Sequence, residues 1–158
     1  MRRFLVVILS LAAQTAVAEE ALGNVGTVRG DYWTRFNDLE LNVVLSAIPI
    51  LDVELGLKLP SSDAHVAVGP RFEVLSRQSE AGPTVRLVLL FGAWFSLGSQ
   101  VQLTDLSVSP GVEATYWFAR RFGITGSISL PFLVPYQNGA LNGAGVQGSP
   151  RVGVGLSF

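Results

Sequence analysis

The sequence Arg151-Val-Gly-Val-Gly-Leu-Ser-Phe158 stands at the C-terminus and alternates strictly in character. Counting back from the last residue, every second side chain is apolar: Phe158, Leu156, Val154 and Val152. The positions between them hold only Ser, Gly and Arg, so the two faces of an extended strand would differ sharply. Alternation that ends on an aromatic residue is typical of a strand in the wall of a transmembrane β-barrel. This stretch therefore predicts the kind of fold to look for in the rest of the chain.

The first 18 residues have the composition of a secretory signal peptide. Arg2 and Arg3 precede a short apolar run at 4–13, and Ala16-Val-Ala18 forms a small-x-small cleavage site before Glu19. The apolar run is too short for a membrane-spanning helix, which needs about 20 residues. We expect a signal peptide at 1–18, cleaved during export, and one β-barrel domain at 19–158.

The composition excludes several classes of function. Without Arg2 and Arg3, nine basic residues remain against twelve acidic ones, which gives no basic surface for a nucleic acid. The chain has no Cys, so it has neither disulfides nor thiolate metal ligands. Charged residues make up 15% of the chain, against about 25% in an ordinary soluble domain. Since no later segment is apolar enough for a spanning helix, a closed barrel is the remaining way to occupy a membrane.

Period-2 alternation runs through the rest of the sequence and separates into segments divided by turn residues. The clearest segment is 51–59, LDVELGLKL, in which every odd residue is apolar. We expect eight strands, at 25–36, 39–47, 51–59, 64–75, 84–97, 105–118, 122–134 and 148–158. The predicted fold class is all-β, an eight-stranded antiparallel up-and-down transmembrane β-barrel, with one long connection at 135–147.

Charged residues fall on one face of every predicted strand and never on the apolar face. Those on the polar face are Arg29, Asp31, Arg35, Glu40, Asp52, Glu54, Lys58, Arg71, Glu73, Arg86, Asp105, Glu113 and Arg151. A charge facing lipid at mid-membrane costs about 2–4 kcal/mol, which explains the separation if the apolar face is outside. The same pattern inverted would give a lipocalin-like barrel that binds an apolar ligand, so this alternative stays open.

Aromatic residues favour the membrane interpretation. If both termini are periplasmic, one group lies near the periplasmic ends of the strands (Phe72, Tyr116, Phe118, Phe122, Phe158) and another near the outer ends (Tyr32, Phe36, Phe95, Phe132). Two such girdles are expected where ring side chains meet lipid headgroups.

On these residues the chain resembles the small eight-stranded outer-membrane barrels of the OmpA and OmpX type. The resemblance implies residence in the outer membrane of a Gram-negative-type bacterium, in contact with outer-membrane lipid. It also implies that Val152, Val154, Leu156 and Phe158 form the signal read by the barrel assembly machinery. The connections at 37–38 and 60–63 are shorter than those usual in these relatives.

An eight-stranded barrel is just wide enough for side chains to fill it, so the inward charges should pair. We expect them to form a structural plug, with Arg71 and Glu73 facing Arg86 and Glu54 at its centre. The alternative is that the same residues line a narrow ion or proton path. His65 follows Ser62 and Asp63, but no catalytic triad geometry is indicated, so we predict no enzyme activity, no cofactor and no metal.

The predicted connection at 135–147 is uncharged and rich in Gly and Asn, and it would expose Tyr136 and Leu141. A segment of this kind is a candidate contact for an extracellular partner. The sequence thus predicts a non-enzymatic outer-membrane barrel with a structural or surface-interaction role. A pore and a lipocalin-like binder are the alternatives.

Overall fold

The structure is a computed structural model, and it describes residues 26–48 and 50–158. The predicted signal peptide therefore lies outside the described residues. The chain forms β1 (Gly26–Trp33), β2 (Asp38–Ile48), β3 (Leu51–Leu59), β4 (Asp63–Leu75), β5 (Gly82–Leu97), β6 (Val101–Ala119), β7 (Phe122–Ser129), β8 (Phe132–Gln137), β9 (Ala140–Leu141), β10 (Gln147–Gly148) and β11 (Arg151–Ser157), with one 3₁₀ turn, η1 (Gly143–Gly145). Across 26–48 and 50–158, no helix has the length and apolar character needed to cross a membrane.

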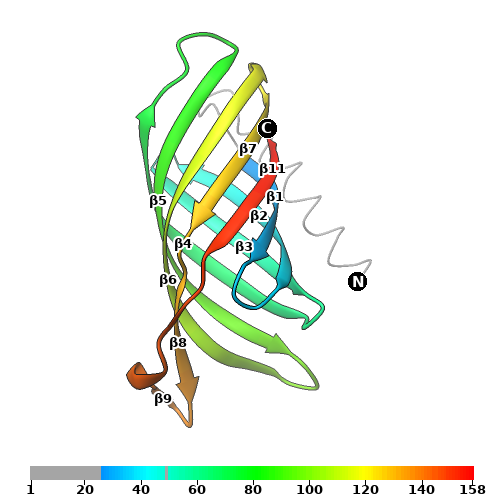
Figure 1. Cartoon of the computed structure of the whole chain (residues 1–158), viewed down its shortest axis with the longest axis vertical. Coiled ribbons are helices and arrows are strands. Elements are labelled where there is room, and N and C mark those ends of the chain that lie inside the picture. The colour runs from blue at the N-terminus through cyan, green and yellow to red at the C-terminus, as the bar shows by residue number, and fades with distance from the viewer. Residues whose placement is uncertain (1–25, 49) are drawn as a thin grey trace.

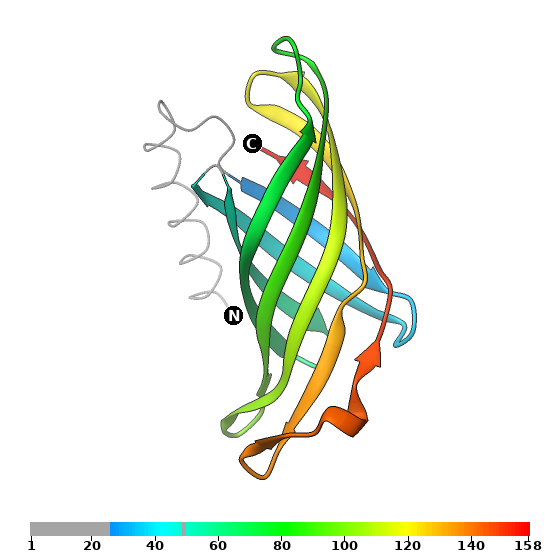
Figure 2. The same cartoon turned by 90° about the vertical axis from the view of Figure 1, so that its left-hand side faces the viewer.

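The strands close into a barrel, as Figures 1 and 2 show. Each strand from β1 to β7 pairs antiparallel with the next, β7 pairs with β11, and β11 returns to β1. At the closing seam, Gly26 and Phe158 exchange two backbone hydrogen bonds of 3.0 Å. The prediction of an all-β, antiparallel, up-and-down barrel is confirmed.

We call each of the eight strand positions around the barrel a wall. Two of these walls are each made of two consecutive strands. β7 and β8 follow one another along β6 and are separated by Leu130-Pro131, while β10 and β11 are separated by Ser149-Pro150. Proline has no N–H to donate to the ladder, so it interrupts a strand. The neighbouring amides still bridge the walls, because Leu130 donates to the carbonyl of Pro110 and Ser149 to that of Pro131. The count of eight walls is therefore the one predicted.

The hairpin of β5 and β6 is longer than expected. These strands span 82–97 and 101–119, whereas the sequence predicted 84–97 and 105–118. A register shift after Trp94 lets Leu103, Gln102 and Val101 continue the pairing towards a turn at 98–100. The extra residues lengthen this hairpin at the end of the barrel where β8 and β9 also extend, as Figure 2 shows.

The predicted long connection is partly a hairpin. β8 continues to Gln137 and returns as β9 through Asn138-Gly139, which have φ angles of 54° and 82°. Two consecutive positive φ angles are characteristic of a type I′ turn, which Asn-Gly favours. Leu141 is exposed as expected, but Tyr136 is half-buried on the hairpin, so that part of the prediction is wrong.

The outside of the barrel is apolar and the inside is charged. Val154 is 65% exposed and Ile128 is 64% exposed, whereas Arg29 is 2% and Glu54 1% exposed. The inverted arrangement is wrong, because buried charges and hydroxyls occupy the lumen where a lipocalin-like barrel would line a cavity with apolar residues. We call the end that holds Gly26 and Phe158 the terminal end, and the end that holds the Asn138-Gly139 turn the hairpin end (Figure 1).

Candidate functional site

Two arginines from the seam strands lie at the centre of the lumen. Arg29 of β1 donates from Nε to Asp31 at 2.7 Å and from Nη2 to Glu54 at 2.6 Å, and its Nη1 binds Glu113. The strand alternation directs all four side chains inward, and each is buried. One guanidinium thereby ties β1 to β3 and to β6 on the other side of the lumen.

Arg151 of β11 lies beside this arginine and shares its partners. Its Nη1 is 2.9 Å from Oε1 of Glu54 and 3.4 Å from Oε2 of Glu40, and its Nε is 3.3 Å from Oδ2 of Asp31. The planar fork of arginine suits this kind of multiple carboxylate contact. Asn42 adds a hydrogen bond of 2.8 Å from Nδ2 to Oδ2 of Asp31.

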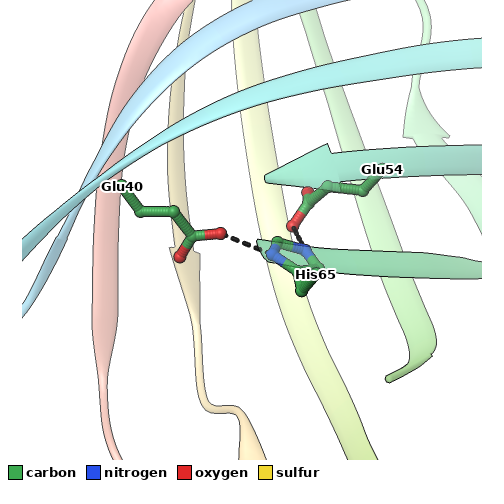
Figure 3. Close-up of side chains that lie close together, drawn as sticks. All are labelled: Glu40, Glu54 and His65. Atoms are coloured by element: carbon green, nitrogen blue, oxygen red, sulfur yellow. Dashed lines mark hydrogen bonds and ion pairs between the residues drawn. The ribbon is translucent and has the colours of Figure 1, made fainter. Parts of the chain in front are cut away.

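His65 of β4 joins the centre between two carboxylates (Figure 3). Its Nδ1 lies 2.7 Å from Oε1 of Glu40, and its Nε2 lies 3.0 Å from Oε1 of Glu54. The ring also stacks on Trp94, with 4.5 Å between centroids. The predicted charge network did not include His65. Its position directly opposite Gly56 on β3 leaves space for the ring.

The predicted centre of the network is wrong. Glu54 faces Arg29 and Arg151, and Arg71 instead binds Asp52 at 3.1 Å. Alternation predicts the face on which each side chain lies, but not the stagger of one strand relative to another. It therefore could not distinguish these pairings.

The predicted contact of Glu73 with Arg86 does form, but nearer the terminal end. Arg86 lies 3.4 Å from Glu73, whose side chain is 41% exposed, so this pair is at the edge of the lumen. Ser46 donates to Asp52 at 3.0 Å and accepts a hydrogen bond from Arg71.

Two residues predicted on the polar face lie outside the network that the described residues form. Arg35 is exposed in the turn after β1 and donates to the carbonyl of Gly148 at 3.2 Å. Asp105 is half-buried near the register shift of β6.

The hairpin end of the lumen is closed by a lysine held among aromatic rings. Nζ of Lys58 lies 5.0 Å from the ring centroid of Trp33, 4.8 Å from Phe36 and 5.8 Å from Trp94, and it pairs with Asp38 at 2.9 Å. Each cation–π contact of this type contributes about 0.5–2 kcal/mol. Phe36 therefore packs over the lumen, and its assignment to the lipid-facing girdle is wrong.

The terminal end is closed by Trp117, which is buried. Its Nε1 donates to Thr84 at 3.1 Å, and the guanidinium of Arg77 lies 4.6 Å from its ring centroid. Behind it, hydroxyl groups bridge four walls, with 2.7 Å between Thr27 and Ser157 and 2.7 Å between Thr115 and Thr125, and Thr125 also contacts Ser157.

The sequence reasoning missed the roles of the three indoles. Trp33, Trp94 and Trp117 all occupy the polar face of their strands, and all three are buried in the lumen. The signal in the sequence that could have predicted this burial was a tryptophan on the polar face of an alternating strand. Tryptophan suits this place because its N–H can find a partner while its ring fills space.

The lumen between these closures is packed. A cavity of about 10 Å³ lies beside the arginines, which is room for about one water molecule. Its wall includes Arg29, Val88, Ser109, Glu113, Ser127 and Arg151.

The other predicted girdle aromatics mostly lie on the outside. Those with exposed side chains are Tyr32, Phe72, Tyr116, Phe118, Phe122 and Phe132, whereas Phe95 and Phe158 are half-buried. At the terminal end, Phe118 lies 5.3 Å from Tyr116 and 6.2 Å from Phe122, between ring centroids. Of the predicted assembly signal, Val152, Val154 and Leu156 face outward on β11.

This geometry matches a solved β-barrel domain. The crystal structure of the N-terminal β-barrel domain of Pseudomonas aeruginosa OprF superposes with a TM-score of 0.53 at 12% identity, over 87% of this chain and 97% of that chain. The chain has the fold of a small eight-stranded outer-membrane β-barrel. At that identity the likeness establishes the fold alone, and at that level the predicted resemblance is confirmed.

Two further structures are similar to this barrel. A de novo designed transmembrane β-barrel matches with a TM-score of 0.46 at 15% identity, over 87% of this chain and 95% of that chain. Neisserial surface protein A matches with a TM-score of 0.43 at 11% identity, over 85% and 93% respectively. No family model matches the chain, and no curated protein sequence matches it.

Proposed function

We propose that the barrel resides in the outer membrane of a Gram-negative-type bacterium and has a structural or surface-interaction role, without conducting ions or catalysing a reaction. The observation that carries this proposal is the filled lumen. Paired charges occupy its centre, Lys58 and three aromatic rings close one end, and Trp117 closes the other.

A plug of this kind opposes conduction for an energetic reason. Breaking a buried ion pair by removing one partner costs about 3–5 kcal/mol, because the other charge is left uncompensated. An ion passing through would have to separate several such pairs, including the contacts of Arg29 and Arg151 with Glu54. The side chains therefore serve as a structural core of the barrel.

The proposed orientation places the terminal end in the periplasm and the hairpin end outside the cell. The short turns at 34–37 and 60–62 would then be outside together with the β8–β9 hairpin and η1. Leu141 is exposed on that hairpin, which makes 135–147 the proposed contact for an extracellular partner. The outward residues of β11 are the proposed signal for the assembly machinery.

The arrangement around His65 supports the absence of hydrolase activity. Both ring nitrogens face carboxylates, Nδ1 towards Glu40 and Nε2 towards Glu54, so neither is directed at Ser62. A Ser–His catalytic pair needs a hydrogen bond between the hydroxyl and the imidazole.

Conductance measurements test the proposal. Residues 19–158, refolded in detergent and added to a planar lipid bilayer in concentrated KCl, should give no current steps, while a porin added afterwards shows that the bilayer accepts barrels. Reproducible steps from the wild-type chain would overturn the proposed closed lumen and favour a narrow pore instead. The orientation is tested separately, by protease accessibility of 135–147 on intact cells.

A further inference from the structure

The centre of the lumen carries more negative than positive charge. Arg29 and Arg151 face four carboxylates there: Asp31, Glu40, Glu54 and Glu113. The other described pairs of Lys and Arg balance one to one, Lys58 with Asp38, Arg71 with Asp52 and Arg86 with Glu73. His65, which lies between Glu40 and Glu54, adds a positive charge only when both of its nitrogens are protonated. Uncompensated charge in a buried site is very costly, so the centre needs further positive charge.

The location of the missing charge is indicated by two buried atoms without hydrogen-bond partners. These are Oδ1 of Asn42 and Nδ1 of His65, and both residues are almost fully buried. Asn42 is held by the hydrogen bond from its Nδ2 to Asp31, which leaves the carbonyl oxygen free. Buried polar atoms without partners are rare and call for an explanation such as a bound ion.

Both atoms lie beside the same carboxylate oxygen. A Cβ placed on Gly56 would be 2.3 Å from Oδ1 of Asn42, 2.3 Å from Oε1 of Glu40 and 2.3 Å from Cε1 of His65, the ring carbon bonded to Nδ1. The two oxygens and this edge of the ring therefore lie around one point. The second oxygen of Glu40 already accepts hydrogen bonds from Trp33 and Arg151. Oε1 accepts only a long hydrogen bond of 3.5 Å from Arg151, so it is the oxygen more available for a cation.

The two nitrogens of His65 have different surroundings. Nε2 is 3.0 Å from Oε1 of Glu54, which also accepts from Arg151, so an Nε2–H donor satisfies that side. With the proton on Nε2, the lone pair of Nδ1 faces Oε1 of Glu40 at 2.7 Å. Three acceptors, Oδ1 of Asn42, Oε1 of Glu40 and Nδ1 of His65, then face one another without a hydrogen-bond donor between them. Only a cation or a second proton on His65 makes this arrangement favourable.

We propose that Glu40, Asn42 and His65 bind a divalent transition-metal ion of the Zn²⁺ or Mn²⁺ type. The ligand-type atoms of Glu40 and His65 lie within 4.8 Å of one another. Oδ1 of Asn42 and Oε1 of Glu40 both lie 2.3 Å from the point where a Cβ on Gly56 would stand, so the three side chains are close enough to share one ion. Metal bonds of about 2.0–2.2 Å require Nδ1 and Oε1 to move apart slightly from their present separation. One imidazole nitrogen with two oxygens suits these ions better than Ca²⁺ or Mg²⁺, which prefer oxygen alone.

The surrounding residues fit this assignment, which goes beyond the proposed function. A double positive charge added to the two guanidiniums neutralises the four carboxylates. Glu54 becomes the outer partner that accepts the Nε2–H and orients the ring, as carboxylates commonly do behind metal-bound histidines. Because the site lies beneath Lys58, Trp33 and Trp94, the ion would enter while the barrel folds and would then link β2 to β4.

Metal retention tests the proposal. Residues 19–158 are refolded in detergent with a small excess of ZnCl₂ or MnCl₂, dialysed exhaustively, and analysed by elemental emission. The wild-type chain should retain about one ion per chain of at least one metal, since a site coupled to folding holds its ion tightly. Glu73→Gln, which changes a carboxylate outside the centre, should retain the same amount. His65→Gln and Asn42→Ala should each lose at least tenfold in retention.

A second measurement covers variants that do not fold. The wild-type barrel refolded with CoCl₂ should show visible ligand-field absorption of ordered nitrogen and oxygen coordination, absent when the same chain is unfolded in urea. Retention in wild type below about a tenth of an ion per chain for Zn²⁺, Mn²⁺ and Co²⁺ would overturn the proposal and assign the missing charge to a second proton on His65. Undiminished retention by a folded His65→Gln variant would also overturn it, because the ion would then be bound elsewhere.

Discussion

Arg29 of β1 places Nη2 2.6 Å from Oε2 of Glu54 of β3, and β2 lies between these two strands. The contact therefore crosses the lumen rather than following the hydrogen-bond ladder. Together with the contact from Arg29 to Glu113 of β6, it makes the interior of the barrel a single cross-linked core.

Replacing that arginine should destabilise the barrel more than replacing an exposed one. Arg29→Met leaves Asp31, Glu54 and Glu113 short of a partner, and we expect a loss of about 3–5 kcal/mol in the free energy of unfolding. Urea unfolding in detergent, followed by circular dichroism, measures it. Arg35→Met, in an exposed turn, is the matched control, and equal losses for the two variants would contradict the account.

The closing seam depends on a glycine. A Cβ on Gly155 would lie 2.2 Å from the carbonyl oxygen of Val28 and 2.7 Å from Cα of Arg29, both in the backbone of β1. Gly155→Ala should therefore force the two seam strands apart and lower the fraction of chain that folds, at a cost of about 1–3 kcal/mol or more. Gly126→Ala, where no atom lies within 4 Å, should fold as wild type. Normal folding of both variants would show that the seam is looser than described.

The indoles should be shielded from lipid. Trp33, Trp94 and Trp117 are all buried in the lumen, so lipids with bromine on their acyl chains should quench the native fluorescence only weakly. Phe72→Trp, at a position 58% exposed on the outside, provides the control and should add a strongly quenched component. Strong quenching of the wild-type chain would mean that the faces of the strands are reversed.

The outer face should tolerate a charge near its rim better than at its middle. Val154→Arg lies at mid-strand on β11 and should cost about 2–4 kcal/mol in lipid vesicles. Val101→Arg, at the start of β6 near the hairpin end, should cost no more than about 1 kcal/mol. Refolding yields and urea midpoints in vesicles compare the two, and a Val154→Arg barrel as stable as wild type would argue against a lipid-facing surface.

Alternation alone predicted which side of each strand carries Arg29, Glu54 and Arg151, because the period of two is fixed by strand geometry. It could not predict that Glu54 meets Arg29 and Arg151 rather than Arg71, since that depends on the stagger between walls. Two local signals were present but unused: Asn138-Gly139 for the β8–β9 turn, and Trp117 on a polar face for the closure of the lumen. The surplus of carboxylates around Glu40 became visible only once the partners of each charge were known.

The central claim is that this chain closes into a membrane barrel with its apolar face outside. Residues 19–158, refolded into lipid vesicles and run on a gel with and without boiling, test it most directly. We expect the unboiled sample to migrate as a distinct, faster band and to give a β-type circular dichroism spectrum. A chain that folds in plain buffer without detergent, and whose migration is unaffected by boiling, would contradict the claim.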